Sequence, residues 1–480
     1  MDFAGRSRDL GHLANQLSQI RTSASGPRGR AVVLLGRRRV GKSRLAQEFV
    51  DRSGLQSIVF QATRGRSATM ERDQLVSAAR SAAQGTPAED LLREVRPLDW
   101  VGALNALASA VPDNEPSIVI LDEVPWLIEQ DPGFEGALQT VWDRALSLKP
   151  VLLLLIGSNI SVMESLQTYE RPFFGRAVPM RLKPLTPGEI QEVTQLDAAD
   201  AFDAFLVTGG FPEIVRTWQR GASLEEFLEE SLSQPLTPLL ASAALTLMGE
   251  FPDSSHARTV IEAIGGYGER TFSGIAGRAG GPQALPSGTL TPILRMLQER
   301  HVVTVDQPLS QKPDTKNKHY RIEDTYLRFW LALIEQAIPY VERGRGDEAL
   351  RQILRSWTSW RGYAIEPVIR EALRWILPND RWPDTNAIGG WWNRQNNPEI
   401  DLVGATGEPV AKKVQFIGSI KWYDNRRFGK HEYAELVSSA AAVPGYTDDT
   451  PLVAVSRAGI EPGTPITASW SPEDLIAAWR

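Results

Sequence analysis

The chain has 480 residues, 42% of them hydrophobic and 23% charged, with a net charge of −6, five histidines and no cysteine. This length predicts roughly three or four domains of a soluble globular protein, and the lack of cysteine excludes disulfides, cysteine zinc sites and thiol catalysis. The histidines lack metal-ligand spacing, the first residues lack an apolar signal core, and the apolar run at 151–156 is too short to cross a bilayer, so we expect a cytoplasmic protein with no zinc centre and no membrane contact.

The first predicted elements are a strand, a glycine-rich loop and a helix. An apolar, β-branched run at 31–35 leads into GRRRVGKS at 36–43, and an amphipathic helical pattern follows. A strand, GxxxxGK[ST] and a helix are the phosphate-binding loop in its required context. Lys42 would reach the β- and γ-phosphates, Ser43 would hold Mg²⁺, and the backbone N–H groups would point at phosphate oxygens. The residues expected to bind ATP or ADP here are Gly36, Arg37, Arg38, Arg39, Val40, Gly41, Lys42, Ser43 and Arg44.

Two later strands end in polar residues. The strand at 117–121 runs into Asp122, which would hold Mg²⁺, and Glu123, which would orient or deprotonate the attacking water. A buried strand capped by solvated acids has the same pattern, but the phosphate loop upstream favours the catalytic interpretation. After the strand at 151–156, Ser158 occupies the position of a sensor for the γ-phosphate or the water, although Ser-Asn is also an ordinary helix cap.

Residues 1–182 alternate helices with buried strands, which predicts a parallel α/β sheet with helices on both faces. The expected strands are 31–35, 57–61, 117–121, 151–156 and 178–182. From residue 183 a helical pattern dominates. Thr186, Pro187 and Glu189 predict a capping box, and the pattern is broken at 208–212. We expect residues 183–250 to form a small helical lid against the nucleotide.

Residues 251–323 predict a winged helix-turn-helix. The expected helices are 256–264, 271–279 and 287–300, the last opened by Ser287 or Thr289, and two strands would form the wing. The net charge gives no global signal of nucleic-acid binding, but the wing turn is basic and would contact DNA phosphates. A packing or autoinhibitory module is the alternative, since the third helix presents few base-reading side chains. The basic residues of the wing are Lys312, Lys316, Lys318, His319 and Arg321.

Several motifs follow one another in a characteristic order. They are FAGR at 3–6, GRRRVGKS, LDEVPWL at 121–127, GSN at 157–159, FFGR at 173–176 and GGFP at 209–212. In this order the chain resembles, over essentially its whole length, the archaeal-type ATPases, a branch of the AAA+-related STAND NTPases.

The resemblance implies roles for four further residues. Gly5 and Arg6 would lie against the nucleotide base, Arg176 would contact the γ-phosphate in cis or in trans, and Pro212 would sense the nucleotide from the lid. The stretch SRD at 7–9 departs from the more acidic sequence usual there.

The C-terminal part, 361–480, is similar to the PD-(D/E)xK nuclease-like domain that closes such ATPases. In active members an acid on the first helix, the aspartate of one strand and the acid of a D/E-x-K strand converge on Mg²⁺, and the lysine stabilises the phosphate. Glu366, Asp401 and Lys421 fit this pattern, but Ser419 stands where the last acid belongs. A hydroxyl does not replace an anionic ligand, although Glu399 shares a strand face with Asp401 and is placed to compensate in part.

We therefore expect an α/β P-loop NTPase of AAA+/STAND type. Its parts would be the ATPase core at 1–182, the lid at 183–250, the winged helix at 251–323, a helical linker at 324–360 and a degenerate α+β nuclease-like domain at 361–480, with Trp391, Trp392 and Trp422 in its core. Its function would be a slowly hydrolysing, ATP-dependent switch that controls binding of DNA, a protein partner or another copy of the chain. The alternatives are an ATP-dependent, Mg²⁺-requiring nuclease in defence or repair, and a nucleotide-bound scaffold without hydrolysis.

Overall fold

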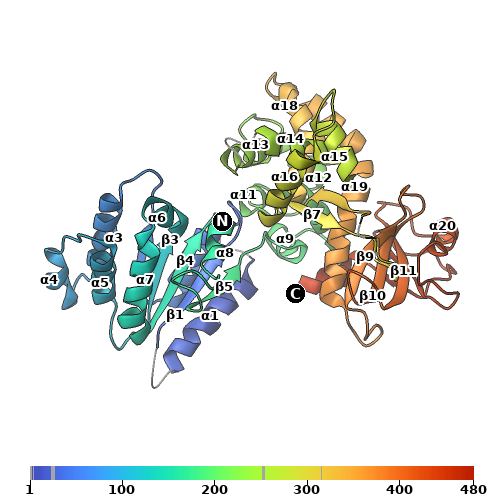
Figure 1. Ribbon diagram of the computed structural model, residues 1–480. Helices are drawn as coiled ribbons and strands as arrows, with labels where there is room; N and C mark the ends of the chain where they lie inside the picture. The colour runs from blue at the N-terminus through green and yellow to red at the C-terminus, as the bar shows by residue number, and fades with distance from the viewer. Residues whose placement is uncertain (1–2, 4, 23–27, 251–254, 315, 480) are drawn as a thin grey trace. The chain divides into compact units, whose positions relative to one another are not determined.

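The computed structural model describes residues 3, 5–22, 28–250, 255–314 and 316–479 (Figure 1). The chain divides into two compact units, Met1–Pro184 and Leu185–Arg480. Across the described ranges, no helix is both long enough and apolar enough to cross a membrane. Residues 251–254 and 315, which belong to the expected winged-helix region, lie outside the described residues.

The first unit is built on a five-stranded parallel sheet with the strand order β2–β3–β4–β1–β5. Each predicted strand is present within one residue of its expected bounds, so the predicted parallel sheet is confirmed. The strands are β1 (Arg30–Leu35), β2 (Gln56–Gln61), β3 (Ser117–Asp122), β4 (Val151–Gly157) and β5 (Ala177–Arg181).

Helices cover both faces of this sheet (Figure 1). One face buries the side chains of Val33, Val119 and Leu153 against α3, α5 and α7, and the other is covered by α1 and α2. Alternation along each strand produces the two faces, because neighbouring side chains point to opposite sides. The helices are α1 (Ser7–Thr22), α2 (Lys42–Ser53), α3 (Ala68–Ala82), α4 (Ala88–Arg93), α5 (Trp100–Ala110), α6 (Val124–Gln130), α7 (Gly133–Arg144) and α8 (Ile160–Ser165), with a short 3₁₀ turn, η1 (Leu146–Leu148).

The second unit begins with a run of helices. The predicted capping box is present at α9: the Thr186 side chain accepts from the backbone N–H of Glu189, whose carboxylate accepts from that of Thr186. The predicted break lies between α10 and α11, where a β-carbon on Gly210 would come within 2.1 Å of the Leu185 oxygen. The helices are α9 (Pro187–Thr194), α10 (Ala198–Thr208), α11 (Pro212–Val215), α12 (Leu224–Ser231) and α13 (Pro238–Glu250).

Three helices and a small antiparallel sheet follow. The sheet has three strands in the order β6–β8–β7, not the two that the sequence predicts, because Arg270 and Thr271 pair with β8. The third helix begins at Ser287, after Pro286, so the predicted start at Thr289 is wrong. The elements are α14 (Ser255–Ile264), α15 (Phe272–Ala279), α16 (Ser287–Glu299), β6 (Arg270–Thr271), β7 (Val303–Asp306) and β8 (His319–Ile322).

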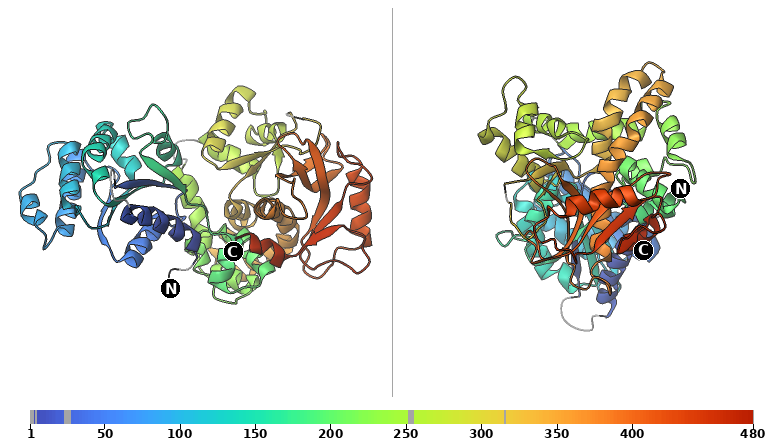
Figure 2. Two further views of the ribbon diagram at one scale, coloured as in Figure 1. Left: turned by 90° about the horizontal axis from the view of Figure 1, so that it is seen from below. Right: turned by 90° about the vertical axis from the view of Figure 1, so that its right-hand side faces the viewer.

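The last part of the chain is a mixed five-stranded sheet, β13–β12–β11–β10–β9, which lies between α19 and α20 (Figure 2). The helix α19 is continuous through residue 361, where a domain boundary is expected from the sequence. Trp391, Trp392 and Trp422 are all buried, but only Trp391 belongs to the core of this sheet, since Trp392 stacks on His319 and Trp422 packs against Phe202. The elements are α17 (Thr325–Phe329), the π-helical turn η2 (Trp330–Ile334), α18 (Glu335–Val341), α19 (Gly346–Ile376), β9 (Ala387–Trp392), β10 (Glu399–Thr406), β11 (Lys413–Lys421), α20 (Lys430–Ala440), β12 (Leu452–Ser456), β13 (Ala468–Trp470), α21 (Pro472–Ile476) and η3 (Ala477–Trp479).

Candidate functional site

A cavity of about 610 Å³ lies in the first unit, at the carboxyl edge of its parallel sheet. This edge is where ligands bind in open α/β sheets, and the volume is typical of a small-molecule site. The lining residues are Arg38, Arg39, Gly41, Lys42, Ser43, Arg44, Gln61, Ala62, Thr63, Arg64, Glu123, Trp126 and Ser158.

The predicted phosphate-binding loop forms one wall of this cavity. Gly41 (φ 91°) and Arg39 (φ 66°) both adopt left-handed backbone conformations. At Gly36 a β-carbon would lie 2.5 Å from the backbone oxygen of Leu182, so only glycine fits beside this segment of the chain. Lys42 Nζ donates to the backbone oxygens of Gly36 (2.7 Å) and Arg37 (2.9 Å). The lysine is therefore held at the loop, within the cavity.

Arg6 supports the loop from behind. Its side chain is buried, Nη2 donates to the backbone oxygen of Val40 (2.8 Å), and Nη1 donates to that of Lys183 (2.6 Å). Gly5 and Arg6 both have positive φ, and this backbone turn directs the arginine inward. Arg6 thus fixes the loop, and the contact of Gly5 and Arg6 with a nucleotide base stays a prediction.

The end of β3 brings together the two groups expected to hold Mg²⁺. Ser43 Oγ donates to Asp122 Oδ2 at 2.6 Å, and the N–H of Glu123 donates to Asp122 Oδ1 at 2.8 Å. Burial raises the pKa of Asp122 above its ordinary value of 3.8, although the hydrogen bond from Ser43 opposes this shift. A hydroxyl beside a carboxylate is the ligand pair of phosphate-loop magnesium sites, so these residues fit the ion.

The Glu123 carboxylate is fixed by two donors. Trp126 Nε1 donates to Glu123 Oε2 (2.9 Å), and Ser158 Oγ lies 3.0 Å from both carboxylate oxygens. Glu123 itself has a φ of 56°, a left-handed conformation that is strained for a residue with a β-carbon and is enriched at functional sites. Asn159 caps α8 by accepting from the N–H of Val162. The helix-cap interpretation is therefore confirmed for Asn159, and the role of Ser158 as a sensor stays a prediction.

Four polar or aromatic lining residues were not expected from the sequence: Gln61, Thr63, Arg64 and Trp126. Arg64 lies over the Trp126 ring, 5.3 Å from its centroid. The first three end or directly follow β2, which pairs with β3 along its length. The sequence did contain a signal for them, because polar residues that follow a neighbouring parallel strand lie at the same edge of the sheet as the residues that follow β3.

Two residues expected near the nucleotide are not among those that line this cavity. Arg176 makes a two-fold ion pair with Asp143 of α7, Nη2 to Oδ2 at 2.7 Å and Nε to Oδ1 at 2.8 Å, which lowers the pKa of Asp143. Pro212 is in the second unit, at the first position of α11. The roles of both in sensing the nucleotide stay predictions.

Two of the five basic residues expected in the wing turn belong to strand β8 instead. His319 is buried, and its Nδ1 lies 2.9 Å from Glu269 Oε2, while Arg321 Nε donates to Asp306 Oδ2 at 2.8 Å. Their expected placement in a phosphate-contacting turn is therefore wrong, because both are bonded to acids of the same small sheet and its neighbouring loop.

The residues of the expected nuclease-like site lie in the second unit. Burial raises the pKa of Glu366 well above its ordinary value, and the nearby charge of Asp401 adds to this effect. Asp401 accepts from Ser419 Oγ at 2.9 Å, and Lys421 is the last residue of β11. Within the described parts of the chain, no three acidic or histidine side chains are grouped as metal ligands.

Comparison with known proteins gives related chains of several kinds. A family model described as archaeal and bacterial proteins of unknown function, DUF234, matches residues 330–432. The uncharacterized protein MJECL04 of Methanocaldococcus jannaschii is 25% identical over 398 residues, 82% of this chain and 83% of that protein.

Solved structures show weaker likeness. The Walker-type ATPase PABY2304 of Pyrococcus abyssi is 19% identical with a TM-score of 0.49, over 69% of this chain and 96% of that one. The ORC2 protein of Aeropyrum pernix, in ADPNP–ADP complexes, is 14% identical with a TM-score of 0.44, over 75% and 96%. The function must therefore be argued from the geometry of the site itself.

Proposed function

We propose that the chain binds ATP with Mg²⁺ in the cavity of the first unit and hydrolyses it slowly. The observation that carries this proposal is the meeting of three separate segments at one cavity: the loop that holds Lys42, the acids Asp122 and Glu123, and Ser158. The sequence separates these segments by many residues, and the parallel sheet brings their ends to one edge. A glycine-rich turn without a binding role is not expected to line the same cavity as a glutamate whose carboxylate is held by two donors.

Each residue has a distinct task in this proposal. The loop N–H groups and the start of α2 hold the phosphates, and Lys42 neutralises charge on the β- and γ-phosphates. Ser43 and Asp122 would hold Mg²⁺, which when bound neutralises phosphate charge. Glu123 accepts a proton from, or orients, the attacking water, and Ser158 keeps the carboxylate in place.

We further propose that the nucleotide acts as a switch for partner binding by the second unit. The exposed face of α16 carries Ser287, Thr289, Thr291 and Arg295, which are chemically suited to contact a nucleic-acid backbone. Pro212 would report the nucleotide state from the lid, and Arg176 would reach the γ-phosphate after leaving Asp143. The partner would be DNA, a protein or a second copy of the chain.

Nucleotide binding and phosphate release in matched variants test the enzymatic part. Lys42→Ala should weaken ATP binding roughly 10–100-fold, the loss of a hydrogen bond to a charged group. Glu123→Gln should keep ATP binding and lower kcat about 10²–10⁴-fold, because it removes the general base. Glu129→Gln, an exposed acid on the same helix, should change neither. Equal, measurable turnover in wild type and Glu123→Gln would refute Glu123 as the general base, and no turnover in either would leave only a nucleotide-bound scaffold.

A further inference from the structure

A second group of buried charges lies in the second unit, around Arg370 of α19. Nη2 of Arg370 donates to Glu366 Oε2 (2.9 Å), and Nε donates to the backbone oxygen of Asp401 (2.8 Å). Its Nη1 lies 3.9 Å from Glu269 Oε1. The Arg370 side chain is only 7% exposed. A permanent positive charge is therefore held against the carboxylate of Glu366 and the backbone of Asp401, two of the residues expected to bind metal in an active nuclease.

The glycine at position 390 leaves room for the Arg370 guanidinium. A β-carbon on Gly390 of β9 would lie 2.8 Å from Arg370 Nη2 and 3.1 Å from its central carbon. Glu366 precedes Arg370 by four residues on α19, so the two side chains lie on one face of the helix. The pairing is thus built into both the helix and the facing strand.

The same acids are already bonded to protein donors. Asp401 Oδ2 accepts from Ser419 Oγ (2.9 Å) and from the N–H of Ile420 (2.8 Å). Ser419 supplies a neutral hydroxyl where the nuclease-like pattern has an acid, so this site offers a divalent ion one carboxylate fewer than the pattern requires. Arg370 already occupies Glu366 Oε2, so a divalent ion bound by the same carboxylate would lie close to the guanidinium, and like charges repel strongly in a buried site. The residues present do not fit a magnesium site.

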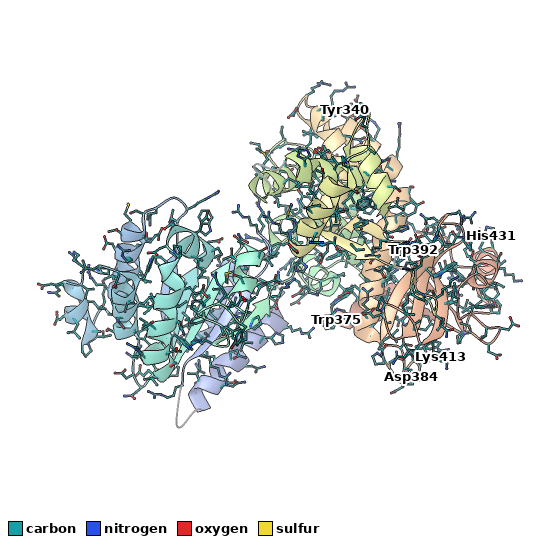
Figure 3. All side chains as sticks on the ribbon, viewed as in Figure 1. Tyr340, Trp375, Asp384, Trp392, Lys413 and His431 are labelled. Carbon is teal, nitrogen blue, oxygen red and sulfur yellow. The ribbon has the colours of Figure 1, made fainter. Side chains whose placement is uncertain are left out.

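The cluster also connects two sheets. Glu269, which precedes β6, pairs with His319 Nδ1 of β8 at 2.9 Å. The His319 ring stacks on Trp392 of β9 with centroids 4.3 Å apart and planes 10° apart. Trp392 is labelled in Figure 3. Through Glu269 and Arg370, the three-stranded sheet is therefore joined to the C-terminal sheet.

We propose that Arg370 is a built-in cation that takes the place of the metal ion in the C-terminal domain. Glu366 and Glu269 pair with Arg370 and so connect the three-stranded sheet to the C-terminal sheet, a set of contacts that we call the joint. The domain is then not a metal-dependent nuclease. This conclusion holds whether or not the first unit hydrolyses ATP.

Metal uptake by the full chain tests the proposal without relying on catalysis. Free Mn²⁺ is measured by electron paramagnetic resonance during titration of nucleotide-free wild type, Asp401→Asn and Asp122→Asn, and cleavage of DNA and RNA is assayed with Mg²⁺ and Mn²⁺. We expect no cleavage, and the same Mn²⁺ uptake in wild type and Asp401→Asn. Cleavage or Mn²⁺ uptake that Asp401→Asn abolishes, and that Asp122→Asn leaves intact, would overturn the proposal.

Thermal unfolding tests the joint itself. Arg370→Gln leaves buried carboxylates unpaired and should lower the melting temperature by roughly 6–20 °C. Arg351→Gln is the matched control, because Arg351 lies on the same helix and pairs with Asp347 at the surface. It should shift the melting temperature by no more than about 2–4 °C. An Arg370→Gln variant as stable as wild type would refute the joint, and the Mn²⁺ titration of wild type stands even if this variant does not fold.

Discussion

Trp126 and Ser158 both donate to the Glu123 carboxylate, and we call this pair of donors the clamp on Glu123. The clamp gives the most specific prediction about the proposed ATPase. In Trp126→Phe the indole N–H that donates to Glu123 Oε2 at 2.9 Å is lost, while an aromatic ring remains beneath Arg64. A hydrogen bond to a charged group is worth about 1.5–3 kcal/mol, which corresponds to roughly 10–150-fold in rate. Because Ser158 still holds the carboxylate, we expect the lower end, about a 10-fold loss of kcat with KM little changed.

The assay is steady-state phosphate release over a range of ATP concentrations, with nucleotide binding measured separately. Ser158→Ala should give a loss of similar size, and the double variant should lose more than either single variant but less than their product, because both donors act on one carboxylate. A value of kcat in Trp126→Phe that is unchanged or raised would refute the view that this clamp positions Glu123 for catalysis.

Three further outcomes follow from buried contacts. Arg6→Gln should weaken ATP binding about 10-fold by freeing the phosphate-binding loop, measured by equilibrium titration. Arg361→Met should lower the free energy of unfolding by about 1.5–3 kcal/mol in urea, because Asp203 would lose a hydrogen bond of 2.9 Å from the buried Arg361 while it keeps its pair with Arg457. Burial raises the pKa of Glu269, but His319 and nearby arginines outweigh it and hold that pKa at about 2, against an ordinary 4.5. This depressed pKa stabilises the fold above pH 4.5 by about 3 kcal/mol, a contribution lost as the pH falls towards 2. Urea unfolding of Glu269→Gln should therefore show a weaker loss of stability between pH 5 and pH 3 than wild type, and identical pH dependence would contradict this assignment.

The sequence predicted the first sheet well because its signals are local. Buried parallel strands are short apolar runs, and the loop and helix after β1 need glycine and lysine at fixed spacing. Arg64 was missed because it belongs to no such motif, and Trp126 was missed because the motif LDEVPWL that contains it gave a role only to its two acids. The rule that predicted Asp122, that polar residues after a parallel strand lie at the carboxyl edge of the sheet, would also have predicted Arg64, because Arg64 follows the neighbouring strand β2.

The buried charges around Arg370, by contrast, could be predicted from the sequence only in part. Glu366, Asp401 and Ser419 were recognisable as a motif with one acid missing, yet Arg370 carried no signal of its own. An arginine four residues after a glutamate on a helix is usually an exposed pair. Its meaning depends on burial against Gly390 and Asp401, which lie on strands that the helical pattern does not identify as neighbours.

By itself, the sequence determined the phosphate-loop motif, the acids that follow β3 and the serine at position 419 where the nuclease-like pattern has an acid, because each depends on residue type and spacing along the chain. Only the tertiary structure decided that Trp126 and Ser158 hold Glu123, that Arg6 fixes the loop, and that Arg370 fills the carboxylate cluster. Those contacts join side chains brought together by sheet order and helix packing, and their chemistry depends on a burial that no local pattern encodes.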